Sequence, residues 1–234
     1  MKRIVIVFFV ILLSCSKEDE VDKLNISYEQ ELIEVDFLTT GETAEPTVNW
    51  NQNKGFFKAT SRQFHGDEFV GRVVFLDSLT GVLSWNKRLP LGENKIEVTA
   101  VGDSSEASVI VIIKNSFKKG FFVGGFSDEV PEEIDYSIVT YDTFMRLEEN
   151  GSTTMWNDVP LTNVIAFGEW YMNRSQITIK YSRESQPDEN YVIVGRLYGK
   201  EGIPKMEIKG KWGIGITPDN EVDKEEGLVK FEND

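Results

Sequence analysis

The side chains most able to do chemistry are scarce in this chain, which holds one cysteine, Cys15, and one histidine, His65. A Ser-His-Asp or Cys-His catalytic device would have to use His65 as its base. The HExxH and CxxC spacings of zinc sites do not occur, and no GxSxG motif precedes a helix. A lone histidine among strands and turns is most often structural. The sequence therefore predicts no catalytic residue, no metal, no cofactor and a protein that is not an enzyme.

Carboxylates are plentiful, and two acidic loops stand beside candidate strands, at residues 128–133 and 219–226. Either loop could offer oxygen ligands to calcium. Neither matches the fixed ligand spacing of an EF-hand, and solvated loop charge is the simpler interpretation. The glycines of residues 120–125 precede no helix and so do not form a phosphate-binding loop.

Cys15 directly follows an N-terminal segment that runs from basic to apolar to small residues. Lys2 and Arg3 precede ten apolar residues, 4–13, which is about half of the ~20 needed to span a bilayer as a helix. The sequence Leu-Leu-Ser-Cys resembles the lipobox of bacterial lipoproteins. This resemblance implies that residues 1–14 are a signal peptide and that Cys15 becomes the diacylglyceryl- and palmitate-bearing N-terminus. An ordinary signal peptide with a free Cys15 thiol is the alternative.

The residues behind Cys15 are polar and acidic, so residues 15–23 are expected to form a solvated tether rather than part of a core. They also resemble the acidic export signal of Bacteroidetes-type surface lipoproteins. That resemblance implies a protein held in the outer membrane by its lipid and facing the cell exterior, and a tether in the periplasm is the alternative. Four residues carry the resemblance: Lys17, Glu18, Asp19 and Glu20.

The chain is strongly acidic, with 39 acidic against 25 basic residues and a net charge of −14. Loss of Lys2 and Arg3 with the signal peptide would bring the net charge to about −16. Such a surface opposes binding to nucleic acid, which requires clustered basic residues. With Cys15 acylated no disulfide is possible, so hydrophobic cores must stabilise one or two domains.

Residues 24–115 read as short alternating segments separated by turns, which predicts a β-sandwich. Segments 80–85, 89–92 and 96–100 resemble the closing strands of cadherin-like and immunoglobulin-like domains in bacterial surface proteins. Such modules serve as spacers or adhesion units. The calcium-ligating clusters of true cadherins are not evident, so no calcium site is carried over.

Residues 116–234 hold a second series of candidate strands joined by mostly short links. Glycines inside strands favour a sheet that closes on itself, and the arrangement resembles small lipocalin-like or avidin-like meander barrels. We therefore predict an eight-stranded antiparallel barrel, with a flat two-layer sandwich as the alternative. The candidate strands cover residues 121–126, 136–147, 152–156, 165–170, 176–181, 191–198, 205–216 and 227–231.

Two local patterns sharpen this prediction. Asn150-Gly151 accepts the positive φ angles of a two-residue type I′ turn, and so predicts a hairpin. Residues 206–216 alternate between apolar and polar, which predicts one buried face carrying Trp212, packed near Trp170. Trp50 and Trp85 are expected in the core of the first unit.

Location is better defined by the sequence than activity. The leading interpretation is an all-β, lipid-anchored surface protein that acts as a non-enzymatic binding or interaction module. The first alternative is a lipocalin-like carrier of a small apolar ligand, which requires an interior cavity. The second is a glycan-binding accessory of a polysaccharide uptake system, which requires exposed aromatic rings such as Trp156 near a strand end. A surface protein is a further candidate partner.

Overall fold

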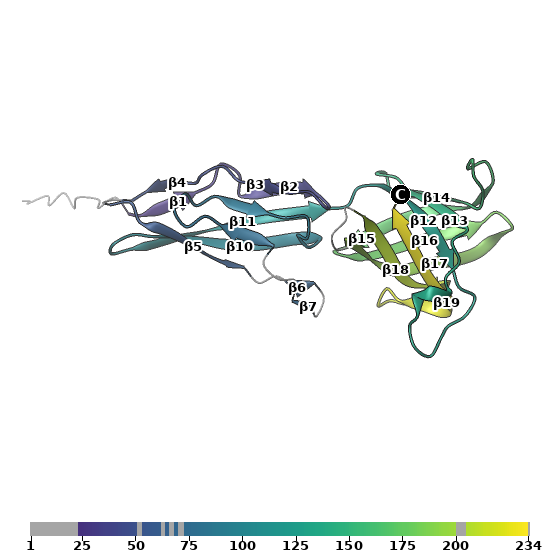
Figure 1. Ribbon diagram of the computed structural model, residues 1–234. Coiled ribbons are helices and arrows are strands. Elements are labelled where there is room, and N and C mark those ends of the chain that lie inside the picture. The colour runs from purple at the N-terminus through teal and green to yellow at the C-terminus, as the bar shows by residue number, and fades with distance from the viewer. Residues whose placement is uncertain are drawn as a thin grey trace, which may run out of the picture.

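The computed structural model describes residues 23–50, 53–61, 64–65, 68–69, 73–199 and 205–233. These residues form two β units joined end to end, each around its own hydrophobic core (Figure 1). The all-β class is confirmed, with a closed eight-stranded antiparallel barrel in the second unit and smaller open sheets in the first. The boundaries drawn at residues 14, 23 and 115 stay predictions.

The first unit is built from two groups of strands that face each other. A four-stranded sheet has the order β2-β11-β10-β5, in which β2 is parallel to β11 and the other pairs are antiparallel. A three-stranded sheet β3-β9-β8 and the pairs β1-β4 and β6-β7 complete the unit. The strands are β1 (Asn25–Ser27), β2 (Leu32–Asp36), β3 (Gly41–Glu42), β4 (Thr47–Asn49), β5 (Phe56–Ser61), β6 (Phe64–His65), β7 (Glu68–Phe69), β8 (Val74–Leu76), β9 (Leu83–Trp85), β10 (Gly92–Val101) and β11 (Glu106–Ser116).

Alternation along β10 fills the core of this unit. Ile96 and Val98 are buried while Glu97 between them is exposed, as a strand with one dry face requires. Trp85 is buried in the same core, and Trp50 packs edge-on against Phe57 with ring centroids 5.4 Å apart. Removal of this apolar surface from water is the main force that holds a disulfide-free sandwich together.

The second unit is a meander that closes, because β12 pairs with β13 on one side and with β19 on the other. The flat two-layer alternative is therefore excluded. The elements are β12 (Gly120–Phe126), η1 (Tyr136–Ile138), β13 (Thr143–Leu147), β14 (Ser152–Trp156), β15 (Val164–Asn173), β16 (Gln176–Arg183), β17 (Gln186–Gly199), β18 (Met206–Ile216) and β19 (Val222–Asn233).

Glycines occupy positions in the barrel wall where the backbones of neighbouring strands approach each other closely. Gly195 of β17 and Gly210 of β18 are direct cross-strand partners. A Cβ on Gly195 would lie 2.6 Å from the Lys209 carbonyl oxygen, and one on Gly210 would lie 2.3 Å from the Val194 carbonyl oxygen. Only glycine fits such an approach.

The predicted alternation of β18 is present. Ile208 and Trp212 are buried in the barrel core, whereas Lys211 is partly exposed. Glu207 departs from the pattern because it is buried on the outer wall, where its carboxylate lies 2.8 Å from the Lys209 ammonium and 3.6 Å from that of Lys230.

The hairpin at Asn150-Gly151 exists, but the prediction of a type I′ turn is wrong. Only Gly151 in this turn has a positive φ, of 84°. The Glu148 amide donates to the Ser152 carbonyl at 2.9 Å, which encloses a three-residue loop, 149–151, instead of two residues. The Asn150 side chain accepts from the Ser152 amide at 3.0 Å, which stabilises this longer loop ending in a left-handed glycine.

The expected strand over 136–147 is also corrected, since β13 begins only at Thr143. Tyr136–Ile138 form a 3-10 turn instead. Asp135 caps this turn, because its carboxylate accepts the Ser137 amide at 2.9 Å and the Ser137 hydroxyl at 2.8 Å. The hydrogen bonds of the Asp135 carboxylate therefore favour a turn at these residues over a strand.

One end of the barrel is covered by the first unit. Leu91 belongs to the barrel core cluster, and Phe37 packs against that cluster. The Asp36 carboxylate lies 2.7 Å from the Lys118 ammonium at the same junction. These contacts close the end of the barrel where β12 begins, and they leave the end where β12 finishes facing away from the first unit (Figure 1).

Candidate functional site

A pocket of about 750 Å³ opens at the end of the barrel remote from the first unit. Strand ends meet there, since β12 finishes at Phe126, β13 begins at Thr143 and β16 finishes at Arg183. The connection 127–142 between β12 and β13 forms one rim. Barrel mouths of this kind are common positions for small-molecule sites because a concave apolar wall is already formed.

The floor of the pocket is apolar and rests on a filled core. Phe126, Met155 and Ala166 contribute to its lining. Ile179 and Phe231 belong to the same barrel core and are fully buried. The pocket is therefore a recess in the mouth of a packed barrel.

Tyr181 carries a polar atom into this apolar floor. The residue is 3 % exposed, and its hydroxyl makes no hydrogen bond of normal geometry with the described residues. Burial raises the pKa of the Tyr181 phenol to about 12, while the nearby Arg183 guanidinium opposes the rise. Native proteins pair nearly all buried polar groups, so this hydroxyl is one of a few exceptions among the described residues.

Arg183 lines the pocket two residues beyond Tyr181 on the same face of β16. Its guanidinium carbon lies 4.4 Å from the ring centroid of Tyr191 and 5.0 Å from that of Trp212. Within the described ranges it forms no salt bridge, and its positive charge lies against the two aromatic faces and beside the Tyr181 phenol. Neither Arg183 nor Tyr181 is among the site residues predicted from the sequence, although the alternation of Ile177, Ile179, Tyr181 and Arg183 could have indicated them.

Trp212 is held firmly at this mouth. Its indole Nε1 donates to the Ser127 carbonyl oxygen at 2.7 Å, and its ring packs edge-on against Phe126 at 5.6 Å between centroids. A Cβ on Gly227 would lie 2.0 Å from the Ser127 oxygen, so the contact needs glycine there. Trp212 is buried as predicted, but its neighbours are not those expected.

Trp170 lies near the opposite end of the barrel, against Phe117, with ring centroids 5.4 Å apart. Its indole Nε1 donates to the Glu148 carbonyl at 2.9 Å. The expected packing of Trp212 on Trp170 is therefore wrong, because Trp170 packs on Phe117 just before β12, whereas Trp212 packs on Phe126 at the end of β12.

Carboxylates form part of the rim of the pocket. Asp128, Glu129 and Asp142 line it and are solvent-exposed. Asp142 accepts a hydrogen bond from the Thr143 hydroxyl at 3.1 Å. In the part of the chain that the structure describes, no group of three or more metal-ligating side chains comes together. The acidic loops 128–133 and 219–226 thus show no clustered cation ligands among these residues.

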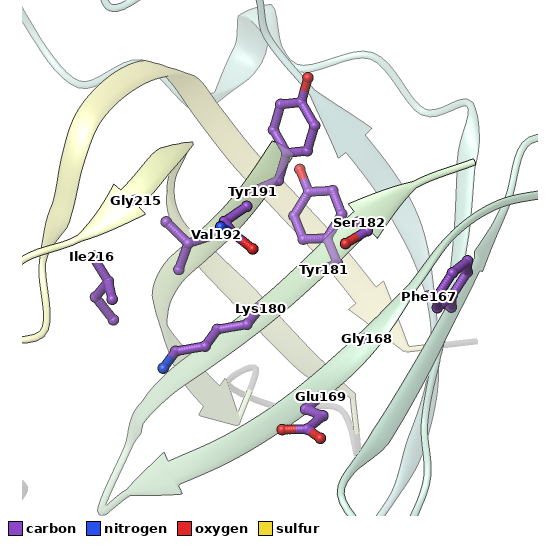
Figure 2. Close-up of a pocket in the computed structure, with 11 residues that line it drawn as sticks. Phe167, Gly168, Glu169, Lys180, Tyr181, Ser182, Tyr191, Val192, Gly215 and Ile216 are labelled. Carbon is purple, nitrogen blue, oxygen red and sulfur yellow. The ribbon is translucent and has the colours of Figure 1, made fainter. Parts of the chain in front are cut away.

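A second hollow of about 500 Å³ lies on the barrel wall, across β15 to β18. Figure 2 shows Lys180 and Glu169 extending from neighbouring strands at one end of it, while the rings of Tyr181 and Tyr191 lie side by side at the other. Phe167, at its edge, is 56 % exposed. Glu169 and Lys180 are also exposed, whereas Tyr181 and Tyr191 are buried.

The residues predicted to direct export and lipidation, Cys15 and Lys17 to Glu20, lie outside the described residues. His65 belongs to β6, but its side chain is outside what the structure describes. Among the residues it does describe, no helix is long and apolar enough to cross a membrane.

The chain is an all-β protein with a closed eight-stranded antiparallel barrel, and the candidate pocket lies at the mouth of that barrel. No family model matches the chain, and no curated protein matches it. A crystal structure of Drosophila N-cadherin EC1-4 is similar at 13 % identity with a TM-score of 0.32, over 82 % of this chain. The aligned part spans 48 % of that structure's chain, and a likeness of this degree carries no inference about activity.

Proposed function

We propose that this chain is a non-enzymatic binding protein of the bacterial surface, in which the barrel mouth takes up a small, largely apolar ligand. In this proposal Cys15 carries the lipid that anchors the chain to the outer membrane, Lys17 to Glu20 direct it to the exterior, and the sandwich acts as a spacer. The observation that carries the proposal is the pocket of about 750 Å³ with an unpartnered buried Tyr181 hydroxyl in its lining.

The binding role is supported by the way the two ends of the barrel differ. One end is closed by Leu91 and Phe37 of the first unit. The other end keeps an open pocket in which apolar side chains such as Phe126, Met155 and Ala166 lie beside polar and charged ones such as Asp142 and Arg183, so it can contact both an apolar and a polar part of a ligand. The volume is within the range of roughly 300–1,000 Å³ found for small-molecule pockets.

The proposal is tested by filling the pocket from its wall. Ala166 lines the pocket and is almost fully buried, so Ala166→Phe should occupy part of the recess. An environment-sensitive apolar dye should bind the parent chain and bind this variant at least several-fold more weakly. Phe167→Ala, at the next residue on the exposed wall, is the matched control and should leave dye affinity unchanged. Equal dye binding by all three chains would contradict the proposal.

A second candidate function is glycan binding by the outer barrel wall. Trp156 and Phe144 are direct cross-strand partners, and Phe121 stacks on Phe144 with ring centroids 6.2 Å apart. The Arg146 guanidinium lies 5.5 Å from the Trp156 ring and 5.8 Å from the Phe121 ring. Flat aromatic groups of this kind can stack on sugar rings. Trp156→Ala should then abolish retardation in polysaccharide-containing native gels, and unchanged mobility of the parent chain would remove this candidate.

A further inference from the structure

We propose that the ligand of the barrel mouth is a small monocarboxylate with an apolar body, and that Arg183 binds its carboxylate. This inference rests on the proposed function, because it names the chemistry of the ligand for that same pocket. It follows from four features: a guanidinium that has no carboxylate partner among the described residues, the buried phenol beside it, the apolar floor and the acidic rim.

The first feature is the orientation of Arg183. Its guanidinium packs near the rings of Tyr191 and Trp212, at 4.4 Å and 5.0 Å from their centroids. A guanidinium stacked on a ring keeps its N–H groups in its own plane and directed outward from the edge. A carboxylate matches that edge because its two oxygens can accept two parallel N–H bonds. Among the described residues no carboxylate forms a salt bridge with Arg183, and its polar side-chain neighbour is the Tyr181 phenol, so a ligand carboxylate would supply the missing anionic partner.

The second feature is the Tyr181 hydroxyl, which is buried and has no partner of normal geometry. It can donate one hydrogen bond to an oxygen acceptor. Tyr181 and Arg183 share one face of β16 and both line the mouth pocket, so an oxygen bound by the guanidinium would lie in reach of the phenol as well. A ligand carboxylate would then satisfy both groups.

The third feature is the surface left for the rest of the ligand. Phe126, Met155, Ile165 and Ala166 line the pocket with apolar atoms. An alkyl or aryl group would be taken out of water against them, and burial of apolar area provides most of the affinity in such pockets.

The fourth feature sets the charge that the pocket accepts. Asp128, Glu129 and Asp142 line the same pocket, and the chain as a whole has a net charge of −14. One ligand carboxylate meets Arg183, but a second would face these acidic side chains with no cation left to balance it. The pocket should therefore discriminate between monocarboxylates and dicarboxylates of the same length.

Calorimetric titration of the full-length chain carrying Cys15→Ala tests the inference with three probes: octanoate, 1-octanol and octanedioate. We expect octanoate to bind and octanol to bind at least roughly tenfold more weakly, because a hydrogen bond to a charged group is worth about that factor. Octanedioate should also bind more weakly than octanoate, because its second carboxylate would face the acidic rim. Arg183→Gln should weaken octanoate by roughly 10–100-fold and leave octanol unchanged. Lys180→Gln removes the same charge from the outer face of β16 and should leave all three affinities unchanged.

The outcomes separate the inference from the proposed function. Octanol binding as tightly as octanoate, with both lost in Ala166→Phe, would overturn the carboxylate inference while the binding function stands. Equal weakening by Arg183→Gln and Lys180→Gln would overturn the role of Arg183 by showing only an effect of net charge. Octanedioate binding as tightly as octanoate would overturn the role of the acidic rim. Circular dichroism of Arg183→Gln should show the parent fold. Arg183→Lys keeps the positive charge without the planar edge of the guanidinium, and it should bind octanoate with an affinity between those of the parent chain and Arg183→Gln.

Discussion

The guanidinium carbon of Arg183 lies 4.4 Å from the ring centroid of Tyr191 at the open mouth of the barrel. Tyr191 in turn stacks on Tyr181, with ring centroids 5.5 Å apart, and approaches Trp212 at 6.4 Å. A cation is therefore held by a connected set of aromatic rings at the one end of the barrel that the sandwich leaves uncovered. This arrangement fixes the position of a positive charge beside the pocket without neutralising it.

Trp212 should contribute strongly to the stability of the barrel. It is 6 % exposed, packs on Phe126 and donates to the Ser127 carbonyl. Trp212→Ala should lower the free energy of unfolding by ~3–5 kcal/mol, from lost apolar contact and the cavity left behind. Urea denaturation measures this. Phe167→Ala, at an exposed position, should change stability by less than ~0.5 kcal/mol, and a larger loss there than at Trp212 would contradict the packing described.

Tyr181 should make the stability of the chain fall at high pH. Burial raises the pKa of its phenol from 10.0 to about 12 in the folded state. Unfolded chains lose this proton near pH 10, so the stabilisation is complete below pH 10 and is lost as the pH rises through 12. Tyr181→Phe should lack this part of the pH dependence, with a residual slope from Tyr28, whose pKa burial also raises to about 12. Parallel unfolding curves of parent and variant from pH 9 to 12 would refute the assignment.

At neutral pH the same variant should be as stable as the parent chain or more stable. Replacement of a buried hydroxyl that has no partner by hydrogen removes a desolvation cost of about 1–3 kcal/mol. Thermal unfolding of Tyr181→Phe at pH 7 measures this directly. A clear loss of stability would mean that the hydroxyl is paired in solution.

Cys15→Ala should abolish metabolic labelling with palmitate and move the protein from the detergent phase to the aqueous phase. A single acyl chain gives only marginal membrane affinity, whereas the diacylglyceryl group implied for Cys15 adds ~0.8 kcal/mol per buried CH₂ over two chains. Continued labelling of the variant would exclude Cys15 as the lipidation site.

Replacement of Lys17, Glu18, Asp19 and Glu20 by alanine should leave labelling intact but make the protein resistant to protease added to intact cells. The reason is that the acidic run is proposed to direct export, not acylation. Equal protease sensitivity of parent and variant would show that the run is only a solvated tether.

Features that are determined within a single strand could be predicted from the sequence, whereas features that depend on contacts between distant residues could not. The alternation over Met206–Ile216 and glycines such as Gly195 and Gly210 were enough to predict a closed meander, because these signals lie within single strands. The turn at Asn150 was assigned to the wrong type, since Asn-Gly is compatible with both a two-residue and a three-residue loop, and side-chain hydrogen bonds decide between them.

The candidate site could not be predicted in the same way. Tyr181 and Arg183 are neighbours on one face of the same strand. They form a candidate site only together with Tyr191 and Trp212, which come from other strands and meet them at the barrel mouth. The pairing expected between Trp170 and Trp212 failed for the same reason. Both residues lie on inward-facing positions, and only the closed barrel determines which end each one occupies.

The most direct test of the central claim is a residue-resolved NMR titration of the full-length Cys15→Ala chain with octanoate. We expect shift changes to concentrate around the barrel mouth, at Phe126, Ala166, Tyr181 and Arg183, and the outer wall at Arg146 to stay unperturbed. Shift changes confined to that outer wall or to the sandwich, with the mouth unaffected at saturation, would contradict it.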